Sequence, residues 1–109
     1  MELSRNVLSW SIDCDVELHL TILEFSGNDF LVSLGGVLES ALRASFRLSD
    51  KRRGARDAAL PLHGKVVDAI CSRNPQAAEQ CMLELIEASR DDLLWVVSAQ
   101  EQKTRRRRT

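Results

Sequence analysis

The sequence has no tyrosine, two prolines and five glycines among its 109 residues. Strands and tight turns favour aromatic, β-branched, glycine and proline residues, so this scarcity favours helices over a β-sandwich or a β-barrel. Hydrophobic residues make up 44% of the chain, which excludes an intrinsically disordered protein. The length allows one small domain with a hydrophobic core, but not two.

Long apolar segments and a disulfide framework are also missing. No uninterrupted apolar run approaches the roughly 20 residues that a membrane-spanning helix needs, and the first residues lack the apolar stretch of a signal peptide. The three cysteines, Cys14, Cys71 and Cys81, form an odd set without framework spacing. We therefore expect buried free thiols in a cytoplasmic protein without membrane association.

Charge is balanced overall but unevenly placed. The net charge is −1, and four consecutive arginines, Arg105 to Arg108, leave the rest of the chain acidic. A basic tail can contact nucleic acid or an anionic surface; the alternative is a frayed, solvated terminus. We expect residues 100–109 to be a basic disordered tail. Any DNA binding by this chain alone should be weak and without sequence specificity.

Apolar spacing and capping residues predict an all-α fold, an antiparallel helical bundle of about four main helices. The first helix covers about 13–26, with Asp13 as its N-cap, and the second covers about 29–48. The third begins near Ala58 to Pro61, after a loop over 49–57. The fourth covers about 75–98, with Asn74 as its N-cap and Pro75 in its first turn.

The second predicted helix combines an apolar stripe with two glycines. Gly35 and Gly36 each lower its intrinsic stability by roughly 1 kcal/mol relative to alanine, and a close helix approach or a kink would explain them. Apolar residues recur at intervals of three and four and predict a core-facing stripe: Phe30, Leu31, Leu34, Val37, Leu38, Leu42 and Phe46.

An acidic residue and a histidine lie one helical turn apart in the first predicted helix. Asp15 and His19 are at positions i and i+4, so both side chains project from the same face. A pair with this spacing most often forms a surface hydrogen bond that supports the helix. The same pair can also supply two ligands to a divalent metal.

Four short patterns follow one another along the chain: Asp15-x-x-x-His19, the turn at 25–28, the helix 62–70 that begins Leu-His-Gly, and the helix start at 74–79. In this order they resemble the FCD-type effector-binding domain of FadR-like regulators in the GntR superfamily. The resemblance runs from about 13 to 95 and implies an all-helical domain that usually dimerises. It also implies binding of small carboxylates, often through a divalent metal held by one Asp and three His.

Carried over residue by residue, the resemblance implies Asp15, His19 and His63 as metal ligands. The fourth ligand position falls at Leu85, which cannot ligate. Three protein ligands can still hold Zn²⁺, Ni²⁺ or Mn²⁺, with water or an effector carboxylate in the open positions. Cys81, one turn before Leu85, is a candidate replacement ligand, although a buried free thiol is the commoner role of such a residue.

Two further side chains are candidates for effector binding. Asn28 either caps the second helix or contacts the effector, and Arg43 either binds an effector carboxylate or is a solvated helix charge. The resemblance covers neither a DNA-binding winged helix-turn-helix nor the first helices of the effector domain. We therefore expect residues 1–11 to be an arm or helix remnant and residues 12–99 to form a truncated FCD-like domain.

The leading functional hypothesis is a regulatory domain that senses a small organic acid through a divalent metal. Without the missing helices, apolar surface should be exposed, so we expect a homodimer or a heterodimer with a full-length regulator. A metal-free interaction or dimerisation domain, or a nonfunctional regulator remnant, is the alternative. We expect no enzymatic activity, since no nucleophile motif accompanies the candidate metal ligands.

Overall fold

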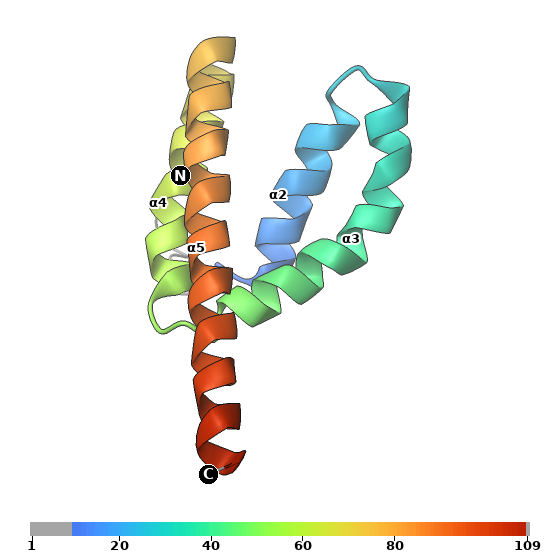
Figure 1. The fold of residues 1–109 in the computed structure, drawn as a ribbon. Coiled ribbons are helices and arrows are strands. Elements are labelled where there is room, and N and C mark those ends of the chain that lie inside the picture. The colour runs from blue at the N-terminus through green and yellow to red at the C-terminus, as the bar shows by residue number, and fades with distance from the viewer. Residues whose placement is uncertain (1–9, 109) are drawn as a thin grey trace. The chain divides into compact units, whose positions relative to one another are not determined.

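The computed structural model describes residues 10–108, which form four α-helices with short connections (Figure 1). No strand occurs in this part of the chain, so the predicted all-α class with four main helices is confirmed. Most of the predicted arm over 1–11 lies outside the described residues. The helices are α2 (Ile12–Glu24), α3 (Asp29–Ser49), α4 (Ala55–Cys71) and α5 (Pro75–Arg108).

The chain divides into two compact units. The α2–α3 unit extends to Leu48, and its two helices run antiparallel (Figure 1). Gly27, with φ +74°, makes the turn between them, since a residue with a side chain rarely adopts this conformation. A Cβ atom on Gly35 would lie 3.9 Å from Leu20, so α3 approaches α2 at this glycine without leaving it crowded.

The α4–α5 unit begins at Ser49, and its two helices pack directly against each other. Buried aliphatic side chains come from both helices, among them Val66 and Ala69 of α4 and Leu85 of α5. The predicted cap of α5 is confirmed: Asn74 Oδ1 accepts a hydrogen bond from the backbone N–H of Ala77 at 3.1 Å. The packed pair therefore has the aliphatic core expected of an antiparallel helical hairpin.

Two predicted helix starts are wrong. Ser11, not Asp13, is the N-cap of α2, and its hydroxyl oxygen accepts a hydrogen bond from the N–H of Cys14 at 3.3 Å. α4 begins at Ala55, after Gly54 in the left-handed region, so Pro61 lies inside the helix rather than in its first turn. Good helix formers on both sides keep this segment helical, although the proline removes one hydrogen bond of the helix.

The end of α5 also differs from the prediction. The helix continues to Arg108, whereas the sequence predicted an end near 98 and a disordered tail from 100. No glycine or proline follows Pro75 in the sequence, and Gln, Glu, Lys and Arg are good helix formers. The arginines in the last turn also interact favourably with the negative end of the helix dipole.

Burial differs from the prediction on α3 and at the cysteines. None of the predicted core stripe on α3 is buried, and Phe30 and Val37 are 70% and 74% exposed. All three cysteines are free as predicted, but Cys14 and Cys71 are exposed and Cys81 is half-buried, so the prediction of buried thiols is wrong. None of the four described helices combines the length and apolar character needed to cross a lipid bilayer.

Candidate metal ligands

The Asp15–His19 pair lies in the first half of α2. The Ser11 cap starts the helix, and Asp13 and Asp15 lie in its first turn, where the positive end of the helix dipole stabilises carboxylates. Asp15 Oδ1 and His19 Nε2 are 3.1 Å apart. The side chains are only 7% and 19% exposed. The structure therefore brings this predicted pair together, as the i,i+4 spacing requires.

A neighbouring ring helps to orient His19. The centroids of the His19 and Phe46 rings are 5.6 Å apart, with an interplanar angle of 38°. Phe46 belongs to α3, so both helices of the α2–α3 unit contribute to the position of this imidazole. The sequence predicted Phe46 only as part of an apolar stripe, because nothing local in the chain indicates which ring it would meet.

The atoms of this pair are at a separation that suits a shared cation. Two ligand atoms that bind one metal at about 2.1 Å lie about 3.0–3.4 Å from each other, for octahedral to tetrahedral angles. The observed 3.1 Å is within this range. It also suits a direct hydrogen bond, so the distance is compatible with metal binding but does not require it.

His63 is on α4, in the second unit, and is 4% exposed. Its Nδ1 lies 2.7 Å from the backbone carbonyl oxygen of Ala59, one turn earlier. In the neutral imidazole this contact places the proton on Nδ1, so Nε2 carries the lone pair. Metal-binding histidines are commonly held by such a hydrogen bond to a carbonyl. The sequence did not predict this Ala59 contact, which any helical i−4 carbonyl can offer.

On α5, the fourth ligand position of the family is occupied by Leu85, and Cys81 lies one turn before it. Leu85 is only 2% exposed, and its aliphatic side chain has no atom that can bind a metal. Cys81 is half-buried, with a free thiol. Its role as a replacement ligand stays a prediction.

The predicted effector ligands are engaged locally. The Oδ1 atom of Asn28 accepts hydrogen bonds from the N–H groups of Phe30 and Leu31, which confirms it as the cap of α3. Arg43 forms ion pairs with Asp13 and with Glu39, the second at 3.3 Å. The hydrogen bond that Arg43 donates to the carboxylate of Asp13 is the main cause that raises the pKa of Arg43. Effector binding by either residue stays a prediction.

An open groove of about 370 Å³ runs along the α2–α3 unit beside Arg43. Four carboxylates outnumber the single guanidinium in it, so it is poorly suited to an anionic effector. The charged lining residues are Asp13, Glu17, Glu24, Glu39 and Arg43.

The described residues therefore form a helical domain with a shielded Asp–His pair and a hydrogen-bonded histidine. A family model described as the FCD domain matches residues 4–88, so the chain belongs to the FCD domain family. Domains of this family are regulatory effector-binding domains of GntR-family transcription regulators, which are generally not enzymes. Neither curated proteins nor solved structures gave a significant match.

Proposed function

We propose that this FCD domain senses a small organic acid through a divalent metal ion held by Asp15, His19 and His63. The observation that carries the proposal is the pair of Asp15 and His19, whose ligand atoms are 3.1 Å apart on the shielded side of α2. Removing a carboxylate from water is costly unless a cation or hydrogen bonds compensate for it. A divalent cation would supply that compensation.

The donor set suits Zn²⁺, Ni²⁺ or Mn²⁺. Imidazole and carboxylate ligands bind all three ions, and sites with three protein ligands keep positions open. The Nδ1 contact of His63 to Ala59 supports this role, because it leaves Nε2 as the atom that can ligate. The apolar side chain of Leu85 in the family's fourth ligand position lowers the expected affinity but does not remove the site.

A bound metal supplies a Lewis-acidic centre whose open positions accept a carboxylate. Effector binding would then change the state of a regulator, either as a homodimer or together with a full-length regulator. Asn28 and Arg43 are kept as proposed effector contacts. Both would have to exchange their present local partners, and Arg43 would have to turn away from the acidic groove beside it, which suits an anion poorly. This role places the protein in the cytoplasm and requires no catalytic step.

The test combines metal analysis with thermal unfolding. At a metal concentration of 100 times Kd, binding to the native state alone should raise the free energy of unfolding by about 2.7 kcal/mol. Asp15→Asn and His63→Ala should each abolish that gain and the metal found by plasma mass spectrometry. Asp68→Asn, which removes an exposed carboxylate from α4, is the matched control and should keep both. No gain with Zn²⁺, Ni²⁺ or Mn²⁺ contradicts the proposal.

A metal-free dimerisation domain is the second candidate, and one observation favours it. Phe25 and Phe30, at the turn between α2 and α3, are 80% and 70% exposed, and Val37 on α3 is 74% exposed. Large apolar side chains exposed in this number commonly mark an interaction surface. Analytical ultracentrifugation of the metal-free protein tests it: a stable dimer that Phe30→Ser dissociates supports this function, and a monomer contradicts it.

A further inference from the structure

The last part of α5 extends beyond the segment that is paired with α4. α4 has 17 residues and α5 has 34, and Arg52, just before α4, meets α5 at Asp92 and Trp95. Its guanidinium lies 3.1 Å from Asp92 Oδ1 and 5.5 Å from the centre of the Trp95 ring. The 13 residues after Trp95 extend α5 by about 20 Å at 1.5 Å per residue. Figure 1 shows this last part of the helix in red. This extension also lies beyond the family match, which ends at residue 88.

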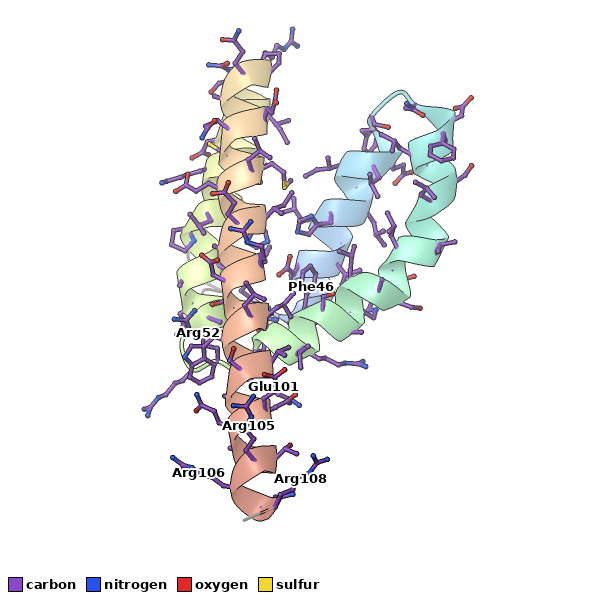
Figure 2. All side chains as sticks on the ribbon, viewed as in Figure 1. Phe46, Arg52, Glu101, Arg105, Arg106 and Arg108 are labelled. Atoms are coloured by element: carbon purple, nitrogen blue, oxygen red, sulfur yellow. The ribbon has the colours of Figure 1, made fainter. Side chains whose placement is uncertain are left out.

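Positive charge surrounds the end of this extension. Residues 103–108 contain five cationic side chains in six positions, and every residue from Gln100 to Arg108 is exposed. Successive residues of a helix are rotated by about 100°, so four consecutive arginines point in all directions. Figure 2 shows Arg106 and Arg108 on opposite sides of the helix. The charge therefore forms a cuff around the helix rather than a stripe on one face.

Repulsion within this basic cuff (residues 103–108) favours a polyanionic partner. Arg105 and Arg108 are three positions apart, and Lys103 and Arg107 are four apart, so like charges are neighbours on the helix surface and destabilise it. Glu101 is the only acidic residue between Asp92 and the end of the chain. Phosphates would remove the repulsion, and guanidinium groups bind phosphate oxygens in a bidentate manner.

The shape and composition of the extension favour duplex DNA over a membrane surface or duplex RNA as the polyanion. Residues 100–108 contain no apolar side chain, whereas a helix that binds a membrane surface buries an apolar face. A helix with a diameter of about 10–12 Å fits the major groove of B-form DNA, about 12 Å wide. The major groove of an A-form RNA duplex is too narrow and deep for it.

We propose that the basic cuff at the end of α5 is a DNA-binding element that contacts the phosphates of duplex DNA without sequence specificity. The element is independent of the candidate metal ligands, which lie on α2 and α4. It would hold the regulatory domain close to DNA while leaving the choice of sequence to another module.

The test is fluorescence anisotropy of the full chain with a labelled 20-base-pair DNA duplex between 50 and 200 mM salt. Four phosphate contacts predict a slope of log K against log salt of about −3.6, which weakens binding by about 150-fold over this range. Two DNA duplexes of unrelated sequence should bind equally. Changing Arg105 to Arg108 to glutamine should lower affinity at least about tenfold at 50 mM salt and reduce the slope to near zero.

The matched control removes the same charge elsewhere on the chain. It changes four exposed cations outside the cuff to glutamine, and should keep most of the affinity and the slope: Arg47, Lys51, Arg53 and Arg90. Glutamine has nearly the helix propensity of arginine, and circular dichroism confirms that α5 persists in both variants. Equal losses in the two variants, or tighter binding to an RNA duplex or to anionic phosphatidylserine vesicles than to DNA, would overturn the proposal.

Discussion

In the α2–α3 unit, the most shielded side chains are polar as often as apolar, whereas in the α4–α5 unit they are mainly aliphatic. The buried residues of α2 are Asp15 and Val16, and α3 has none. In the second unit, Val66, Ala69 and Leu85 are all buried, and His63 is the one buried ionisable group among the described residues of that unit. Among the described residues, the first unit therefore has few buried apolar side chains beside the Asp15–His19 pair, and most of the buried apolar side chains belong to the second unit.

This contrast has a thermodynamic consequence for sensing. A segment with few buried apolar contacts opens at a low free energy, and a ligand that binds only its closed form stabilises it in proportion to its affinity. Metal binding at the proposed ligands would therefore stabilise the α2–α3 unit, which supplies Asp15 and His19, more than the better packed α4–α5 unit, which supplies only His63. A ligand shifts such an opening equilibrium by the difference in its affinity for the two states.

Truncation of a core side chain in the second unit should have the largest effect. Leu85→Ala removes a side chain that is 2% exposed, and comparable substitutions lower the free energy of unfolding by about 2–5 kcal/mol. Phe30→Ala removes a larger side chain that is 70% exposed, and should lower it by less than about 0.5 kcal/mol. Urea unfolding followed by circular dichroism measures both.

The results for these two substitutions test whether the two units differ in their buried apolar packing. If Phe30→Ala costs as much as Leu85→Ala in dilute protein, α3 has a buried face in solution. A dependence of the Phe30→Ala effect on protein concentration would instead indicate that a second copy covers this helix.

The helices were predictable because their signals are local. The apolar intervals and the asparagines before α3 and α5 place the starts of these helices correctly, and both asparagines cap as expected. Pro61 was misleading, because a proline is a start signal in isolation but is tolerated inside α4. Low hydrophobicity does not predict the end of α5, because a polar segment is typical of disorder, whereas Gln, Glu, Lys and Arg also favour helix.

In the candidate site, too, local features could be predicted from the sequence and tertiary contacts could not. The proximity of Asp15 and His19 follows from one helical turn, so the sequence was sufficient to predict it. The ring of Phe46 against His19 depends on tertiary packing, which spacing along one helix does not determine. The burial of residues on α3 could not be predicted either, because an apolar stripe indicates a face that needs cover but not whether the described chain supplies it.

Hydrogen exchange should show a difference of intermediate size between the two units. Backbone amides in the middle of α3 should exchange at least about tenfold faster than those around Val66 and Leu85, because α3 has no buried side chain. A tenfold factor corresponds to a difference of about 1.4 kcal/mol in opening free energy. If the proposed site binds zinc, saturating Zn²⁺ should slow exchange in α2 and leave residues 75–95 of α5 less affected. Equal protection of α3 and α4 without metal would contradict the contrast.

The smallest effect should come from the first turn of α2, where Ser11 has two roles. Its hydroxyl oxygen caps the helix through the N–H of Cys14, and its hydroxyl lies 3.5 Å from the thiol sulfur. This hydrogen bond is the main cause that lowers the pKa of Cys14, against opposing contributions from burial, Glu17 and Asp13. Ser11→Ala should lower the free energy of unfolding by about 1 kcal/mol through loss of the cap.

The same substitution should raise the pKa of Cys14, because a donor to the thiolate is lost. At pH 8 the thiolate fraction then falls, and alkylation by iodoacetamide should slow by about two- to threefold. Cys71, which is also exposed, serves as the internal reference and should keep its rate; mass spectrometry of the labelled peptides measures both. Faster alkylation of Cys14 would mean that opening of the helix end outweighs the lost hydrogen bond, so the α2–α3 unit would be less ordered at Ser11 than its cap indicates.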